Sequence, residues 1–440
     1  MRTFQGGVHP KEEKYLTENS AFEFFQPKSQ VILPLTQHLG KQAKPKVKKG
    51  SVVVLGELIA EADGFISAPI HSPVCGTVVS IGKLDTVSGF PKDSIVITPN
   101  EQTEKALLPP LDPEIATPDE IRNRVAEAGI VGQGGAAFPT SVKLTPPKDK
   151  VIEMVILNGC ECEPYLTRDY RFMLERPDAV IAGLRLIMKA LGVKQGIIGV
   201  EDNKPKAVES LKSNLKENDA IKVLVLKTKY PQGAEKMLIK AATGREVPPG
   251  KLPLDVGIVI QNVGTAVSIY DAIVKGEPLI TAALTVSGKG IKNPKNLIVP
   301  VGTPIMDVLD FCGGVTEDAA KVVVGGPMMG VAQFNFFAPV MKATSGIVVL
   351  TNKEADEKDE TPCLRCGQCV EACPLGLMPT KLARYTQLEK FEEAENIGIT
   401  VCMECGTCAF TCPANIPLVQ WIRLGKQKVT QLQQKRVVTK

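Results

Sequence analysis

Histidine is scarce in this sequence of 440 residues, which contains only His9, His38 and His71. Imidazole is the side chain that most often transfers protons near neutral pH, so we expect the chemistry to depend on other groups. The net charge of +4 is too small to argue for a nucleic-acid partner. No apolar run approaches the roughly 18 residues of a membrane-spanning helix, and residues 1–10 lack the apolar core of a signal peptide. We therefore expect a protein of the reducing cytoplasm, where unpaired thiols persist.

Cysteine, by contrast, is plentiful, and most of it forms two copies of the pattern C-x-x-C-x-x-C-x-x-x-C-P between residues 363 and 413. This run is typical of the module that holds two [4Fe-4S] clusters in bacterial ferredoxins. Three closely spaced thiolates can bind three corners of one cubane, but the fourth follows too soon to reach the last corner. It is therefore expected to bind the other cluster. The predicted ligand sets are Cys363, Cys366, Cys369 and Cys412 for one cluster, and Cys402, Cys405, Cys408 and Cys373 for the other.

Two other uses of cysteine fit this pattern less well. Zinc sites usually take four ligands from paired C-x-x-C units, and disulfide frameworks belong to small secreted chains. Of the four cysteines outside the pattern, we expect Cys75 and Cys312 to be buried as small apolar side chains. A redox or metal-binding role is open for Cys160 and Cys162.

The remaining length is enough for about three further domains, and residues 1–110 are predicted to form the first, from short strands. Its segments 61–64 and 72–78 resemble the hammerhead of biotinyl and lipoyl carrier domains, which predicts a barrel-sandwich. Gly64 stands where those domains carry the modified lysine, so a structural role is favoured over a swinging arm. Five lysines between Lys41 and Lys49 indicate a solvated face. Docking to an acidic partner or to anionic lipid headgroups is the alternative.

A glycine-rich loop opens the next region. Thr117 and Glu120 form a capping box, which predicts a helix ending at a left-handed Gly129. The loop then contains Gly132, Gly134 and Gly135 and continues through Phe138-Pro-Thr to Lys143. It has neither the Walker spacing nor a strand before it. Its use would be the close approach of backbone N–H groups to a phosphate or a flat ring, with Lys143 as a point charge.

Strand and helix patterns alternate from residue 151 to about 275, which predicts a mostly parallel sheet. The expected strands are 151–157, 196–200, 221–226 and 256–260, with helices at 177–191 and 233–242. Ligands of such sheets bind beyond the carboxyl ends of the strands. The segments that follow strands there are 158–164, 230–235 and 261–265.

Residues 279–350 return to β character, with one helical stretch at 304–311. The runs Thr285-Val-Ser-Gly and 299–304 resemble the β-grasp module called soluble-ligand-binding. An acidic linker from Glu354 to Glu360 leads to the cysteine runs, and residues 380–395 between the runs are predicted to form one helix.

Together these motifs make nearly the whole chain resemble the C subunit of the Rnf ferredoxin:NAD⁺ oxidoreductase, and its middle resembles the flavin-bearing subunit of respiratory complex I. The resemblance implies a multidomain α/β plus β fold in four parts. These are a barrel-sandwich hybrid domain (1–110), a Rossmann-like FMN/NADH domain (115–275), a β-grasp module (279–350) and a two-cluster ferredoxin-like domain (360–425).

The resemblance also implies a site for FMN and NAD(H), with Glu161 and Glu163 as the catalytic carboxylates and Phe138 stacked on the dinucleotide. Two positions depart from the family pattern. Ala137 replaces a glycine and could crowd the dinucleotide, and Cys160 stands where complex I has a carboxylate. The implied cofactor-binding residues are Gly132, Gly134, Gly135, Phe138, Lys143, Asn158, Glu161, Glu163, Tyr230, Gly233, Glu235, Asn262 and Thr265.

We therefore expect reversible hydride transfer between NAD(H) and FMN, then single-electron steps through two [4Fe-4S] clusters. Flavin must stand between them because hydride carries two electrons and a cluster accepts one. The resemblance further implies membrane-bound and flavin-bearing partner subunits that couple the reaction to ion translocation, indirect use of ferredoxin, and a peripheral position on the cytoplasmic face of the membrane. Two alternatives remain open: a soluble flavin/iron–sulfur reductase of the cobalamin-reductase or proline-reductase-associated type, and a non-enzymatic two-cluster relay with a degenerate flavin site.

Overall fold

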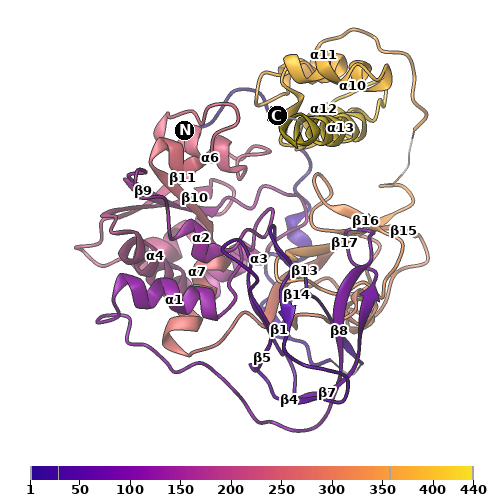
Figure 1. The fold of residues 1–440 in the computed structure, drawn as a ribbon. Helices are drawn as coiled ribbons and strands as arrows, with labels where there is room; N and C mark the ends of the chain where they lie inside the picture. Colours follow the sequence, from indigo (N-terminus) through magenta and orange to yellow (C-terminus); the bar gives the residue numbers. More distant parts are fainter. Residues whose placement is uncertain (1, 28, 356–357, 439–440) are drawn as a thin grey trace.

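In the computed structural model, which describes residues 2–27, 29–355 and 358–438, the strands form four sheets (Figure 1). One of them is four-stranded and parallel throughout, as the alternating pattern predicts. Its strand order is β11 (Ile221–Leu226), β10 (Gln195–Glu201), β9 (Met154–Gly159) and β12 (Ile258–Asn262).

Helices cover both faces of the parallel sheet, because its strands alternate apolar side chains between two cores. Leu157 belongs to the larger core with α1 (Pro118–Glu127), α3 (Arg168–Glu175), α4 (Pro177–Leu191), α5 (Pro205–Ser213) and α7 (Val263–Val274). Ile156 points to the smaller core under α6 (Glu235–Thr243). The polar segments 158–164, 230–235 and 261–265 lie at or after the carboxyl ends of β9, β11 and β12.

Helix α1 begins and ends as predicted. The Thr117 N–H donates to Glu120 Oε2 at 2.7 Å, and the Glu120 N–H donates to Thr117 Oγ1 at 3.3 Å, which completes the capping box. Gly129 has φ +63°, and an added Cβ would lie 2.4 Å from the Pro69 carbonyl oxygen, so only glycine suits this position. The glycine loop follows directly and leads into the short helix α2 (Thr140–Lys143).

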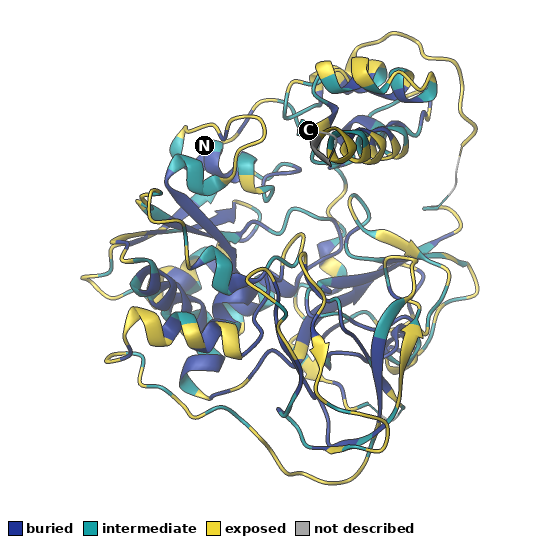
Figure 2. Cartoon of the chain, viewed as in Figure 1, coloured by how far each residue is buried: buried dark blue, intermediate teal, exposed yellow. Residues whose placement is uncertain are grey.

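Two small antiparallel sheets form the barrel region. One contains β2 (Val31–Pro34), β8 (Lys92–Pro99), β7 (Gly76–Leu84) and β4 (Val52–Val53), and the other contains β3 (Lys44–Pro45), β5 (Leu58–Glu61) and β6 (Ile70–His71). A largely exposed connection, residues 100–115, runs from here to α1 (Figure 2).

The fourth sheet is mixed and six-stranded, in the order β1 (Phe22–Phe24), β14 (Lys295–Pro300), β13 (Thr281–Ser287), β17 (Gly346–Thr351), β15 (Ala319–Val324) and β16 (Val331–Gln333). Helix α8 (Ile305–Phe311) packs into its core, which also contains barrel residues such as Leu33 and Ile97. Strand β1 lies within residues 1–110, the range predicted for the first domain, but it pairs in parallel with β14. This long-range pairing leaves no local sequence pattern that would report it.

The C-terminal unit is helical and lies at one end of the molecule (Figure 1). It contains α9 (Gln368–Glu371), α10 (Pro379–Gln387), α11 (Phe391–Asn396), α12 (Thr407–Phe410) and α13 (Leu418–Val438). The single helix predicted over 380–395 is wrong: the chain breaks at Glu389, which has φ +54°, so that α10 and α11 can both pack on α13. Residues 356–357 of the expected acidic linker lie outside the described residues. None of the described helices is long and apolar enough to cross a membrane.

Candidate flavin site and cluster module

Three predicted segments meet at the carboxyl ends of β9 and β12. Asn158, in β9, donates its amide N–H to the Gly233 carbonyl at 2.7 Å, which ties the first segment to the second. A Cβ on Gly134 would lie 3.2 Å from the Asn262 amide nitrogen, so the glycine loop stands directly against the third segment. The structure thus brings together residues that are more than 100 positions apart in sequence.

The glycine loop is held by its own backbone. The Gly132 N–H donates to the Phe138 carbonyl at 2.9 Å, which closes the loop. The Gln133 N–H donates to Thr265 Oγ1 at 3.0 Å, so the predicted Thr265 hydroxyl supports the loop rather than pointing out of it. Gly135 has φ +99° and nothing within 4 Å of where a Cβ would stand. Its backbone is open to close approach by a ligand.

Ala137, the departure from the family glycine, also has a positive φ of +52°. The backbone conformation explains why glycine is favoured at this position. The alanine adopts it at a cost of roughly 1 kcal/mol.

Lys143 and Glu235, both predicted site residues, form an ion pair with 2.7 Å between Nζ and Oε1. Lys143 also donates to the Ile260 carbonyl at 3.2 Å. Both side chains are partly exposed at the rim of the site. The ammonium is therefore kept in place but remains accessible to an anionic group.

The prediction from sequence missed a buried network below these segments. Arg168 donates to Asp169 Oδ1 at 2.6 Å, to the Gln133 carbonyl at 3.0 Å and to Asn262 Oδ1 at 3.1 Å. Asn262 in turn donates to Asp169 Oδ2 at 2.7 Å. Arg168 and Asp169 are 2% and 6% exposed, so this pair fixes the loop and the end of β12 from inside. The adjacent Arg168 and Asp169, which follow the acidic segment 158–164 closely, are the sequence feature that could have indicated this network.

The two predicted catalytic carboxylates are bound to backbone N–H groups. Glu161 accepts from the N–H of Asp169 at 2.6 Å and of Tyr170 at 3.2 Å, at the first turn of α3. Glu163 accepts from the N–H of Met328 and of Met329, both at 3.0 Å, and from Tyr230 Oη at 3.4 Å. Both groups therefore anchor neighbouring elements in this structure, and the sequence predicted no such bonds.

Burial raises the pKa of Glu163 to about 7, although the bonds from Met328 and Met329 oppose the shift. Burial also raises the pKa of Glu161. The folded state then holds a proton that the unfolded chain releases, so this part of the stability falls as pH rises from about 4.5 to about 7.

Glu163→Gln should remove the share of this dependence that Glu163 contributes, because the amide cannot ionise, and should leave the share of Glu161. We expect the free energy of unfolding of the variant, relative to the natural chain, to rise by about 3 kcal/mol across that pH interval. Anaerobic urea unfolding at a series of pH values measures it. Glu163→Asp, which still ionises, is the control that should retain the slope. A pH-independent difference between the glutamine variant and the natural chain would contradict the assignment.

Two buried lysines lie under the acidic segment and were also missed. Lys14 Nζ donates to the carbonyls of Glu161, Glu163 and Leu166 at 2.7–3.0 Å. Lys204 Nζ donates to the Cys160 carbonyl at 2.7 Å and lies 3.3 Å from Glu201 Oε2. Isolated lysines give no sequence signal, because lysine is normally a surface residue.

The thiols outside the two runs make ordinary contacts. The Gly233 N–H donates to Cys162 Sγ at 3.3 Å, and Cys160 is fully buried. Burial raises the pKa of both thiols, which disfavours the reactive thiolate. Cys75 and Cys312 are buried, as predicted.

Each predicted cysteine quartet lines one cavity of the helical unit. Cys363, Cys366, Cys369 and Cys412 line one of about 250 Å³. Cys402, Cys405, Cys408 and Cys373 line the other. In both cases the fourth cysteine comes from the opposite run. Among the described residues, no group of three or more His, Cys, Asp or Glu side chains is arranged to hold a metal ion.

The second quartet lies against the flavin-type domain. Tyr230 Oη donates to the Cys405 carbonyl at 2.8 Å. A Cβ on Gly406 would lie 2.8 Å from the Met328 carbonyl, in the loop that Glu163 holds. The first quartet is more open, since Cys363 and Cys366 are exposed.

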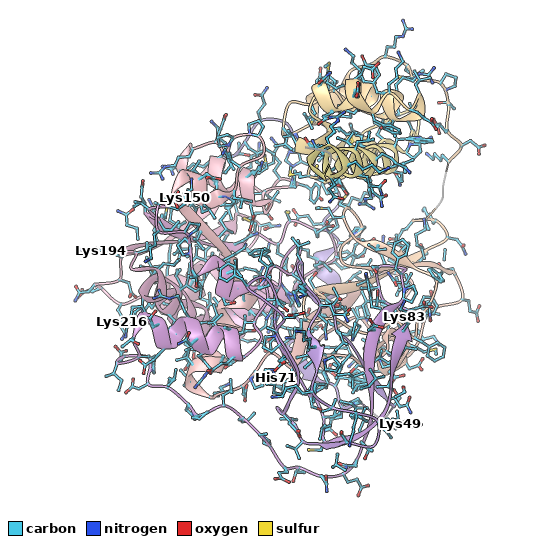
Figure 3. All side chains as sticks on the ribbon, viewed as in Figure 1. Lys49, His71, Lys83, Lys150, Lys194 and Lys216 are labelled. Atoms are coloured by element: carbon cyan, nitrogen blue, oxygen red, sulfur yellow. The ribbon has the colours of Figure 1, made fainter. Side chains whose placement is uncertain are left out.

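The lysine run of the barrel region lies away from this junction. Lys41 and Lys44 pair with Asp63 at 2.7 Å and 3.0 Å, whereas Lys49 is exposed at the lower end of the molecule, far from the helical unit (Figure 3). The pairing with Asp63 fits a solvated face.

An α/β domain with this loop, joined to two cysteine quartets, defines the class of flavin/iron–sulfur electron-transfer proteins. Four family models match: the RnfC barrel sandwich hybrid domain (2–102), the Nuo51 FMN-binding domain (125–271), the SLBB domain (284–332) and a 4Fe-4S dicluster domain (355–413).

Relatives cover almost the full length. The C subunit of the proton-translocating ferredoxin:NAD⁺ oxidoreductase complex of Clostridium ljungdahlii is 48% identical over 97% of this chain and 94% of its own. The Na⁺-translocating counterpart of Acetobacterium woodii is 45% identical over 97% of each chain. The chain belongs to the RnfC family, which provides the C subunit of the ion-translocating ferredoxin:NAD⁺ oxidoreductase, or Rnf, complex. A structure of NAD⁺-reducing [NiFe]-hydrogenase shares the fold, with a TM-score of 0.52 and 18% identity over 71% of this chain and 63% of that one.

Proposed function

We propose that this chain transfers electrons between NAD(H) and two [4Fe-4S] clusters by way of FMN, as the C subunit of an ion-translocating electron transport complex. One observation carries the proposal. Tyr230, from a predicted flavin-binding segment, is hydrogen-bonded to the backbone of Cys405, a predicted cluster ligand. A direct bond between the two candidate sites supports a short path from flavin to cluster.

The residues present suit a flavin mononucleotide. In the glycine loop, the backbone at Gly135 is open to close approach by a ligand, and Lys143 offers a cation for the phosphate. Gln232 and Gln261, which are 0% and 2% exposed, each have two side-chain polar atoms without a hydrogen-bond partner among the described residues. Buried amides normally find partners, so these two are available to a polar ligand at the same strand ends.

Bound FMN supplies the exchange between two-electron hydride chemistry and one-electron cluster chemistry. The protein's own groups bind and orient. Asn158 holds Gly233, and the Arg168–Asp169 pair holds Gln133 and Asn262. Glu161 and Glu163 set the position of α3 and of the 326–329 loop, and their catalytic role stays a prediction from the sequence.

The wider setting follows from family membership. We propose membrane-bound and flavin-bearing partner subunits that couple electron flow to ion translocation, indirect use of ferredoxin, and a peripheral position on the cytoplasmic face of the membrane. The domain limits 1–110, 115–275, 279–350 and 360–425, and the labels barrel-sandwich, Rossmann-like and β-grasp, belong to the same proposal.

Anaerobic titration with NADH tests the function. We expect bleaching of the flavin absorption, followed by EPR signals of two reduced clusters. A chain with intact clusters but without flavin, and without response to NADH, would instead support the two-cluster relay. Flavin reduction in a chain that does not assemble with membrane subunits would support the soluble reductase.

A further inference from the structure

The first residues of the chain lie along the acidic segment of the flavin site. The Tyr165 N–H donates to the Glu12 carbonyl at 2.8 Å, and the hydroxyls of Thr17 and Thr167 are 2.7 Å apart. Lys14 lies between these contacts. The family model for the barrel domain begins at residue 2, and the model for the FMN domain begins at residue 125. Part of the segment that matches the barrel-domain model therefore lies in the flavin site.

The Lys14 ammonium is the common partner of three carbonyl oxygens. They belong to Glu161, Glu163 and Leu166, and the side chain is only 8% exposed. All three N–H donors of the ammonium are used. Carbonyl dipoles aimed at one buried point repel one another unless a cation stands there. Lys14 thus determines the local path of residues 161–166.

That path is unusual for its residue types. Glu161 has φ +48° and Tyr165 has φ +68°, both in the left-handed region that only glycine adopts freely. Two such residues within five positions persist only when the surroundings hold them. The three bonds from Lys14 go to residues 161, 163 and 166, which span this interval, and they supply that hold.

We propose that Lys14 is a positioning residue of the flavin site: its ammonium fixes residues 161–166 in the conformation that binds FMN. The inference rests on the proposed function. Because this stretch continues the segment that begins with Asn158 and carries both carboxylates, loss of the ammonium lets the wall of the site relax. Binding of FMN therefore weakens, while the clusters, which other residues hold, remain.

The test compares Lys14→Met with Lys11→Met in the full chain. Lys11 is exposed in the same segment, so its variant controls for the loss of one positive charge. FMN is titrated into flavin-stripped protein, and fluorescence quenching gives Kd. We expect Kd to rise roughly tenfold or more in Lys14→Met, with Kd unchanged in Lys11→Met and with equal iron content in both.

Rescue separates positioning from general damage. Lys14→Arg keeps the charge and several donors, so its Kd should return most of the way to that of the natural chain. A merely disrupted core would not be repaired by a larger side chain. If Lys14→Met does not fold, Lys14→Gln, which keeps one amide group, is compared with Lys14→Arg, and the glutamine variant should bind FMN more weakly.

Two results overturn the inference: equal Kd in the Lys14→Met and Lys11→Met variants, or an arginine variant no better than methionine or glutamine. If the natural chain itself binds no FMN, the proposed function fails, which is a different result from equal binding by all variants.

Discussion

The Cys412→Ser substitution should remove the cluster held by the first cysteine run, although Cys412 itself belongs to the second run. Cys412 lines the same cavity as Cys363, Cys366 and Cys369, and a serine hydroxyl is a poor ligand for an iron–sulfur cluster. We expect the Cys412→Ser chain to lose about half of its iron. Iron analysis together with EPR of the reduced protein measures the loss.

Double variants reveal which thiols share a cluster. Combining Cys412→Ser with Cys363→Ser should cost no more iron than either change alone, because both remove one cluster. Combining Cys412→Ser with Cys402→Ser should remove nearly all the iron. The reverse pattern would show that each run holds its own cluster. Cys75→Ser is the control: its thiol donates to the Glu104 carbonyl, which a hydroxyl can also do, and iron content should not change.

Arg168→Met should cost about 3–5 kcal/mol of unfolding free energy, because it leaves the Asp169 carboxylate buried without its cation. It also frees the Gln133 carbonyl and so releases the glycine loop, which should abolish stable FMN binding. Denaturant unfolding and flavin content measure the two effects.

A second Arg–Asp ion pair provides the control for Arg168→Met. Arg185 binds Asp219 in the same domain, but its side chain is 34% exposed, so Arg185→Met should cost less than about 1 kcal/mol. Adding Asp169→Asn to the Arg168→Met chain should recover part of the stability, because it removes the uncompensated charge. Equal costs for Arg168→Met and Arg185→Met would show that the buried network does not anchor the loop.

Local sequence patterns predict a large part of this molecule. The capping box, the parallel sheet and the helix 177–191 were each predicted from local sequence patterns, and the structure confirms them. The grouping of Cys373 with the second run also follows from spacing, because a short chain cannot fold back to the same cluster.

The missed features depend on contacts between distant positions. Lys14 and Arg168 carry charges that normally face water, and only the folded chain shows that both are buried beneath the flavin site. Strand β1 pairs with β14 across more than 270 residues. The break at Glu389 arises from packing of α10 and α11 on α13, which overrides a continuous helical pattern.

The apolar core that the barrel strands share with the six-stranded sheet has a consequence for how the molecule opens. Leu33 and Ile97 of the barrel and Leu284 and Ile347 of the sheet belong to one cluster of buried side chains. Neither part can expose its half without exposing the other, so the two should unfold as one cooperative unit in native-state hydrogen exchange. The helical unit has its own core, around Leu382 and Ile422. We therefore expect the helical unit to open separately from the sheets in the same experiment.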